Sequence, residues 1–277
     1  MTVSAETARK MWRSLEPIHG MIYFAPEAPA AYADLGITDL RTGYFASRSA
    51  PMGAVPAELV IATFFNFNPA LVRRAIPGAW AIASPASILQ ARLDAVDGAL
   101  ARLLGSVDLE EAASLARTAA SCPSMSPGGR PLYAGHASLP WPTTPRLELW
   151  HALSLLREYR GDGHIAALVT EGVDAVEALV IHAGTGEVPR AALQTSRAWD
   201  DTAWDAAVAR LLERGWVGPD GSLTDAGRAH RQRVEDLTDE LALAPWAHLG
   251  TEGCERLREI GRPLSRAVVA AGTFGAR

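Results

Sequence analysis

The chain has 277 residues, of which 48% are hydrophobic and 21% are charged. This composition excludes a disordered chain. The length is sufficient for two domains of roughly 100–150 residues each. The formal net charge of −5 lies entirely in residues 146–277, where 20 acidic residues outnumber 15 basic ones.

The sequence shows no sign of a secreted or membrane protein. Residues 1–13 are polar and amphipathic and lack the charged-then-apolar pattern of a signal peptide. The longest apolar runs, such as residues 59–65, fall far short of the roughly 20 residues that a membrane span needs. Cys122 and Cys254 lie far apart in the sequence, which argues against a disulfide framework or a cysteine-based zinc site. We expect a cytoplasmic protein with no membrane partner, no metal and no cofactor.

Helical periodicity dominates residues 1–120, where apolar residues recur at i, i+3 and i+4. The first helix is expected over residues 5–23, with a kink or a split at Pro17. Proline and capping residues mark the starts of several of the helices that follow. Those helices are expected over residues 26–35, 38–49, 57–65, 69–75, 85–104 and 108–120. The sequence therefore predicts an N-terminal helical bundle over residues 1–120, with a role in ligand binding.

A loop-forming stretch follows the bundle at residues 121–145. It contains six prolines and three glycines, and loops of that length are usually functional or disordered. Tyr133, His136 and Trp141 indicate that part of the stretch packs against the protein as a lid. We interpret residues 121–145 as a linker or lid between one domain at residues 1–120 and another at residues 146–277.

Residues 146–277 are predicted to be helical apart from one short hairpin. Helices are expected over residues 146–160, 162–171 and 173–183, the last two ended by glycine. A helix over residues 200–214 precedes Pro219-Asp220-Gly221, which lies between two short apolar runs and predicts a hairpin turn. A long helix then begins within residues 223–228.

This order of elements resembles the MarR family of winged-helix regulators. The resemblance rests on LLERGWV at residues 211–217 and LTDAGRA at residues 223–229. It implies a mainly α fold in which a C-terminal MarR-like winged helix has one small β-hairpin wing and terminal helices that form a homodimer. The whole chain also resembles an actinobacterial helix-turn-helix protein family, through LEPIH at 15–19, TFFNF at 63–67 and REYRGDGH at 157–164. That second likeness implies no particular activity.

The surface that would read DNA is acidic. Residues 173–226 hold nine carboxylates and four arginines, although phosphate neutralisation depends on Lys and Arg. The first turn of the expected recognition helix, residues 199–205, has three aspartates and two tryptophans, and the wing has no cation. DNA is therefore an alternative partner rather than the favoured one. Its contacts would come from Arg190, Arg197, Arg210 and Arg214.

Several polar and aromatic side chains are candidates for a small-molecule site. His19 and Tyr23 lie four residues apart on the first helix, and the aromatics and amides of residues 64–68 suit a pocket wall. A core histidine, a helix cap at Asn68 and a surface ion pair at Arg48 are the alternative roles. The predicted ligand-binding residues are His19, Tyr23, Arg48, Phe64, Asn66, Phe67, Asn68, Trp141, His151 and His164.

The densest polar cluster lies at residues 151–164. His151, Glu158 and His164 offer donors that suit zinc or iron, but their spacing matches no established metal motif. Capping and ion pairing are the commoner roles for such residues. The sequence contains no nucleophile elbow, phosphate-binding loop or dinucleotide fingerprint, so no catalytic residue can be named.

These observations favour a small-molecule-binding protein with a winged-helix domain. The pocket is expected between the two domains, beneath residues 133–141, with an apolar or aromatic ligand whose anionic group lies near Arg48. One alternative is a MarR-like transcriptional regulator that binds DNA. The other is an acid–base or metal-dependent enzyme built on the same pocket.

Overall fold

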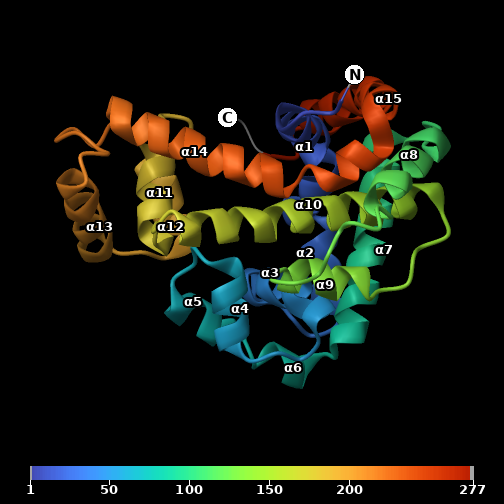
Figure 1. The fold of residues 1–277 in the computed structure, drawn as a ribbon. Helices are drawn as coiled ribbons and strands as arrows, with labels where there is room; N and C mark the ends of the chain where they lie inside the picture. Colours follow the sequence, from blue (N-terminus) through green and yellow to red (C-terminus); the bar gives the residue numbers. More distant parts are fainter. Residues whose placement is uncertain (1, 275–277) are drawn as a thin grey trace.

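The computed structural model describes residues 2–274, most of which lie in α-helices (Figure 1). Two short 3-10 helices, η1 (Met21–Tyr23) and η2 (Ala50–Met52), follow α1 and α3. In chain order the α-helices are α1 (Ala5–Gly20), α2 (Glu27–Asp34), α3 (Leu40–Ser49), α4 (Ala57–Phe64), α5 (Pro69–Ala75), α6 (Ala79–Ile82), α7 (Pro85–Leu104), α8 (Glu110–Ala120), α9 (Pro131–Ala137), α10 (Pro145–Thr170), α11 (Ala175–Ala183), α12 (Arg190–Arg197), α13 (Asp201–Glu213), α14 (Asp225–Leu241) and α15 (Ala244–Ala270).

Side-chain caps fix the start of several helices. Asn68 and Ser84 each precede a proline at the first helical position and accept hydrogen bonds from backbone amides of α5 and α7. Asp174 and Glu177 form a reciprocal capping box at α11. Thr224 caps α14 in the same way as Asn68 and Ser84 cap their helices. The mainly helical class predicted from the sequence is confirmed.

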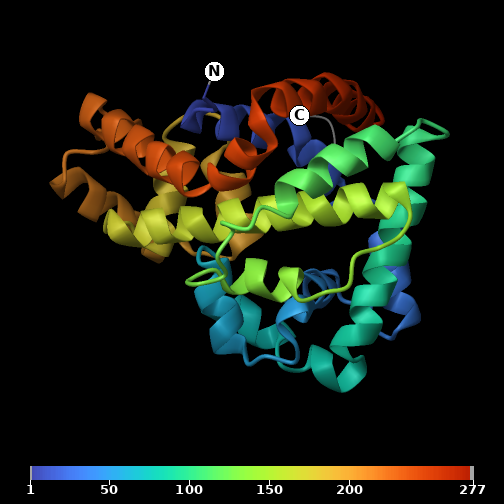
Figure 2. The same cartoon turned by 45° about the vertical axis from the view of Figure 1, so that its right-hand side comes forward.

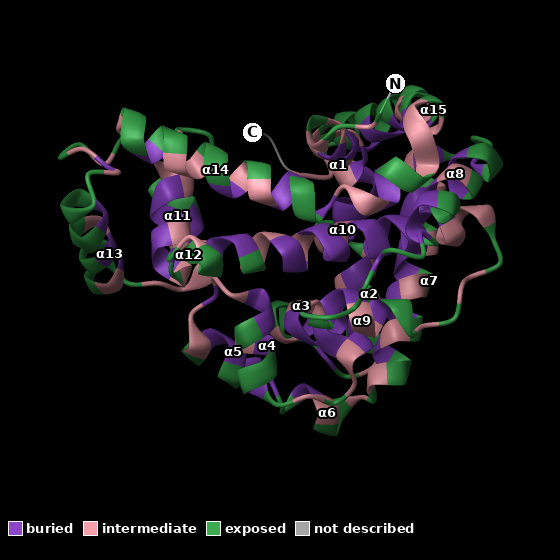
Figure 3. Ribbon diagram, in the orientation of Figure 1, coloured by how far each residue is buried: buried purple, intermediate pink, exposed green. Residues whose placement is uncertain are grey.

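Buried apolar residues form two clusters, and α10 runs through both. The first cluster takes in α1 to α9, the first part of α10 as far as Tyr159, and α15. The second extends from Ala167 to Val234 and joins the end of α10 to α11, α12, α13 and α14. Figure 3 shows α10 buried along most of its length. In Figure 2 the second cluster projects from the side of the larger first cluster.

The stretch at residues 121–145 contributes to the first cluster. Cys122, Met125, Leu132 and Tyr133 are buried, and residues 131–137 form α9. The division of the chain into domains at this stretch stays a prediction.

The predicted β-hairpin wing is wrong. The described residues contain no strand, and a single antiparallel bridge joins Val217 to Leu223. The turn itself is present, because the Gly218 amide donates to the Ser222 carbonyl at 2.8 Å. The Thr224 amide also donates to the Trp216 carbonyl at 3.0 Å. Pairing ends there because α14 begins at the next residue, Asp225. The turn at residues 217–223 is therefore held by one bridge and forms no two-stranded wing.

Two predicted helix ends are also absent. Pro17 does not split α1, which continues to Gly20. α10 continues through Gly161 and Gly163 instead of ending at residue 160. A Cβ at position 163 would lie 2.9 Å from Arg130 Nη1 and 3.2 Å from Leu241 Cβ. Gly163 therefore permits close packing on α10 and does not end the helix.

The terminal helices pack within the chain. The apolar side of α15 belongs to the first cluster through Cys254, Leu257, Leu264 and Val268, and α15 lies against α1 and α8. The expected homodimer stays a prediction. None of the long helices within residues 2–274 carries the apolar stretch that a bilayer span requires.

Candidate functional site

A cavity of about 250 Å³ lies between η1, α2 and α3. Tyr23, Tyr32 and Tyr44 line it, and the exposed part of its lining includes Phe24 and Leu40, which are 59% and 69% exposed. A dry cavity of about 150 Å³ is enough to bind benzene. The cavity therefore has room for a substituted aromatic ring, which the exposed apolar residues would attract from solvent.

The local sequence explains how the tyrosines gather. Asp39 caps α3 by accepting a hydrogen bond from the Thr42 amide at 2.7 Å. Tyr44 lies one turn further along α3, next to Gly43. A Cβ at position 43 would lie 2.9 Å from Tyr32 Cδ2, so the glycine lets the Tyr32 ring approach α3.

Three arginines lie next to the tyrosines that line the cavity, and each arginine comes from a different helix. Arg48 of α3 donates from Nη1 to the Tyr44 hydroxyl at 2.8 Å. Arg92 of α7 donates from Nη2 to the Tyr23 hydroxyl at 3.1 Å and from Nη1 to the Ser47 carbonyl at 3.1 Å. The two guanidinium groups therefore bond directly to residues that line the cavity.

The third arginine, Arg157 of α10, connects the cluster to two carboxylates. Arg157 Nη1 lies 2.7 Å from Glu158 and Arg157 Nε lies 3.0 Å from Glu16. Glu158 also lies 3.8 Å from Arg48 Nη2. Burial raises the pKa of Glu158, but Arg157 and Arg48 lower it more, to about 2. Glu158 is therefore ionised at neutral pH and offsets part of the arginine charge.

His19 lies beside this cluster as a neutral histidine. Its ring stacks on Trp150 with centroids 5.0 Å apart, and neither ring nitrogen has a hydrogen-bond partner among the described residues. Burial lowers the pKa of His19 well below its ordinary value, and the charge of Arg157 lowers it further. His19 lines a second cavity of about 20 Å³, which has room for no more than about one water molecule.

Five of the predicted ligand-binding residues are brought together. Arg48 is a member of the arginine cluster, and its guanidinium lies 4.4 Å from the centre of the Phe64 ring. The other four, His19, Tyr23, Phe64 and Phe67, lie around the cluster. Only Tyr23 of these lines the larger cavity. Their role in ligand binding stays a prediction.

The remaining predicted residues make contacts elsewhere. Trp141 packs on His151 with ring centroids 4.8 Å apart, and His164 Nδ1 lies 3.0 Å from Thr238 Oγ1. The metal alternative finds no support, because no group of three His, Cys, Asp or Glu side chains in the described part of the chain could hold an ion. The larger cavity lies within the first cluster and residues 133–141 do not line it.

Sequence reasoning missed Tyr32, Tyr44 and Arg92. The sequence did contain a usable indication for Arg92, which interrupts the apolar side of α7 between Ile88 and Val96 and is only 2% exposed. An arginine in the apolar stripe of a helix is rarely buried without a purpose.

The four arginines predicted to contact DNA are engaged within the chain. Arg190 lies 2.7 Å from Asp201 and 3.1 Å from Asp205, both on the exposed face of α13. Arg210 and Arg214 lie close to Glu177, at 2.8 and 3.5 Å. Arg197 instead lies 4.7 Å from the centre of the Phe67 ring.

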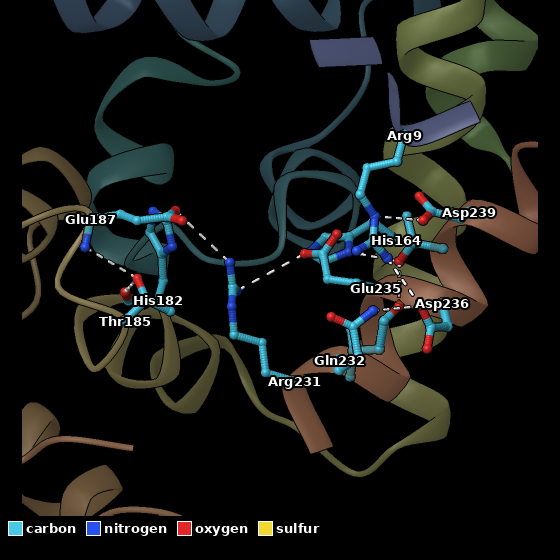
Figure 4. Close-up of polar contacts among 12 residues, drawn as sticks. Arg9, His164, His182, Thr185, Glu187, Arg231, Gln232, Glu235, Asp236 and Asp239 are labelled. Atoms are coloured by element: carbon cyan, nitrogen blue, oxygen red, sulfur yellow. Dashed lines mark hydrogen bonds and ion pairs between the residues drawn. The ribbon is translucent and has the colours of Figure 1, made fainter. Parts of the chain in front are cut away.

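The arginines of α14 are neutralised in the same manner. Figure 4 shows Arg231 between Glu187 and Glu235, at 4.0 and 3.9 Å. Arg228 pairs with Asp225 at 2.7 Å. Folding therefore does not gather these cations into a free basic stripe.

A model of a helix-turn-helix family matches residues 8–275. The chain belongs to this helix-turn-helix family. The match covers both hydrophobic clusters, and membership suggests a DNA-binding, regulator-like domain. No curated protein and no solved structure matches the chain.

The turn between α12 and α13, residues 198–200, is fastened to the segment that follows α4. Trp199 Nε1 donates to the Asn66 carbonyl at 2.9 Å, and Asn68 Nδ2 donates to the Ala198 carbonyl at 2.9 Å. Ala198 has a φ of 58°, a left-handed conformation that is uncommon for residues other than glycine. Asn66 and Asn68 therefore hold this turn in place, and Asn68 also caps α5.

The same turn is linked to the cavity wall through aromatic contacts. The Arg197 guanidinium lies over Phe67, and the Phe67 ring lies 5.7 Å from the ring of Tyr44. A second link comes from α3, where Arg41 Nη1 donates to the Ser196 carbonyl at 3.1 Å. Helix α3 therefore contacts both the cavity and the end of α12.

Proposed function

We propose that this helix-turn-helix protein binds a small molecule with an apolar or aromatic body in the cavity lined by Tyr23, Tyr32 and Tyr44. The observation that carries the proposal is a cavity of about 250 Å³ with three tyrosines in its wall. Ligand sites are usually concave and mostly apolar, with a few polar groups that fix orientation. This cavity has that character.

The expected affinity is modest. An aromatic ligand that buries about 150–250 Å² gains roughly 4–6 kcal/mol at about 25 cal/mol per Å². Lost translational and rotational freedom cancels much of that gain, so polar contacts must supply the rest. Titrations should therefore reach millimolar ligand.

We further infer that ligand binding acts on the helix-turn-helix turn. Tyr44 lines the cavity and contacts Phe67, and Phe67 lies beneath Arg197 at the end of α12. A ligand that shifts Tyr44 would change the packing of Phe67 and the position of residues 197–199. This contact path makes the protein a candidate ligand-responsive regulator.

Cavity-narrowing variants test the ligand proposal. Ala28 lines the cavity on α2, whereas Ala33 lies on the exposed face of the same helix. The neutral probe 2-naphthamide, followed by isothermal titration calorimetry, should bind wild type and Ala33→Phe alike and Ala28→Phe at least tenfold more weakly. Thr38→Trp, at an exposed lining position, provides a second variant that does not disturb the core. Equal binding by all variants would refute the proposal.

DNA binding is the second candidate, and membership of the helix-turn-helix family favours it. The charge of the surface weighs against it, because Asp201 and Asp205 have side chains 82% and 66% exposed on α13. Salt-dependent retention on DNA that Arg210→Ala and Arg214→Ala weaken would place this candidate first. We expect no retention even at low salt.

A further inference from the structure

Arg92 is buried without a direct ion pair, although its charge and that of Glu158 do interact through space. It is 2% exposed, and no carboxylate of residues 2–274 lies within ion-pair distance of it. Its hydrogen bonds go to the Tyr23 hydroxyl and the Ser47 carbonyl, and its Nε has no partner among the described residues. A buried charge is costly unless an opposite charge or a full set of hydrogen bonds compensates it.

The whole cluster carries the same imbalance. Arg48, Arg92 and Arg157 face two carboxylates, Glu16 and Glu158, and both of these are bound by Arg157. The neighbouring histidines do not change the net charge of the cluster, because they are buried and neutral. One positive charge is therefore left over, and it lies behind the wall of the cavity.

Hydrogen bonds connect the buried arginines to two tyrosines of the cavity wall. Tyr23 accepts a hydrogen bond from Arg92, and Tyr44 accepts one from Arg48. A phenol that accepts from a guanidinium still has its own proton to donate, and the adjacent cation makes it a stronger donor. Both tyrosines line the cavity, and we expect an anionic oxygen there to reach their hydroxyls.

We propose that the cavity takes a monoanionic aromatic ligand, whose charged oxygen accepts from the Tyr23 hydroxyl and whose charge balances Arg92. The proposal rests on the ligand-binding function proposed above and adds the charge of the ligand. A carboxylate on an aromatic body is the simplest molecule with this chemistry.

A pair of probes of equal shape tests the proposal. Calorimetric titration compares 2-naphthoate with 2-naphthamide, which differ in charge and not in size. Wild type should bind the carboxylate at least about tenfold more tightly, as expected for a charge-assisted hydrogen bond. Arg92→Met should remove that preference and still bind the amide. Arg102→Met, which removes an exposed cation from the same helix, is the matched control and should keep the preference.

Tyr23→Phe gives an independent measurement if Arg92→Met does not fold. It removes the hydroxyl but leaves the ring and the guanidinium, and it should also reduce the preference for the carboxylate. Equal binding of the two probes by wild type would overturn the monoanion proposal and leave the ligand-binding function standing. A preference that survives both Arg92→Met and Tyr23→Phe would overturn it too. Failure of wild type to bind either probe would count against both the monoanion proposal and the ligand-binding function.

Discussion

Replacing Glu158 with glutamine tests the arginine cluster that supports the cavity. Glu158 is 4% exposed, and its pKa lies at about 2 in the folded chain against 4.5 for an unperturbed glutamate. Each pKa unit corresponds to about 1.4 kcal/mol, so ionised Glu158 contributes roughly 3 kcal/mol to the free energy of unfolding at pH 7. Loss of one partner of a buried ion pair commonly costs about 3–5 kcal/mol, which agrees in magnitude.

The pH dependence of this contribution has a defined sign. Because folding lowers the pKa of Glu158, the stabilisation is complete above pH 4.5 and is lost as the pH falls towards 2. Urea unfolding of wild type and Glu158→Gln should therefore differ by roughly 3 kcal/mol at pH 7 and by roughly half of that at pH 3.

An exposed ion pair provides the control. Glu111 pairs with Arg256 at 2.7 Å on the surface, and Glu111→Gln should leave the free energy of unfolding unchanged within error. The reasoning is refuted if Glu158→Gln destabilises no more than this control, or if the difference from wild type is the same at pH 3 as at pH 7.

Three further predictions concern other parts of the molecule. Asp201→Ala combined with Asp205→Ala should increase retention on DNA at low salt, because it frees Arg190 and removes two exposed charges from α13; unchanged retention would contradict the view that these aspartates repel DNA. Burial raises the pKa of Asp162 to about 6, so the free energy of unfolding of wild type should fall, relative to that of Asp162→Asn, as the pH rises from 4 to 7; parallel pH profiles of the two proteins in urea unfolding would show that Asp162 is not desolvated. Gly163→Ala should destabilise α10 by about 1–3 kcal/mol because its Cβ would meet Arg130 and Leu241, whereas Gly161→Ala, whose Cβ finds only an ordinary contact, should be neutral or stabilising in thermal melts.

Local sequence features allowed much of the secondary structure to be predicted. Apolar periodicity identified α1 and α7, and the possible cap at Asn68 marked the start of α5 correctly because the cap and its amide partner are near neighbours in sequence. The continuity of α10 could not be predicted in this way. Gly161 and Gly163 suggest helix ends in the sequence, and the reason for Gly163 lies in contacts with Arg130 and Leu241, which are distant along the chain.

The candidate site was predicted only in part, for the same physical reason. His19, Tyr23, Arg48, Phe64 and Phe67 were each identified from local composition, and they do lie around one cluster.

The cavity itself depends on tertiary packing. Its wall joins η1, α2 and α3, and Arg92 reaches it from α7. Periodicity within one helix cannot reveal which of its side chains meets a wall built from three other segments.

A crystal structure of the full chain grown with 2-naphthoate tests the central claim most directly. The account predicts electron density for the probe in the cavity between η1, α2 and α3, with its carboxylate within hydrogen-bond distance of the Tyr23 hydroxyl. A structure in which the tyrosine rings fill this space themselves, or in which the probe binds only elsewhere, would contradict the account.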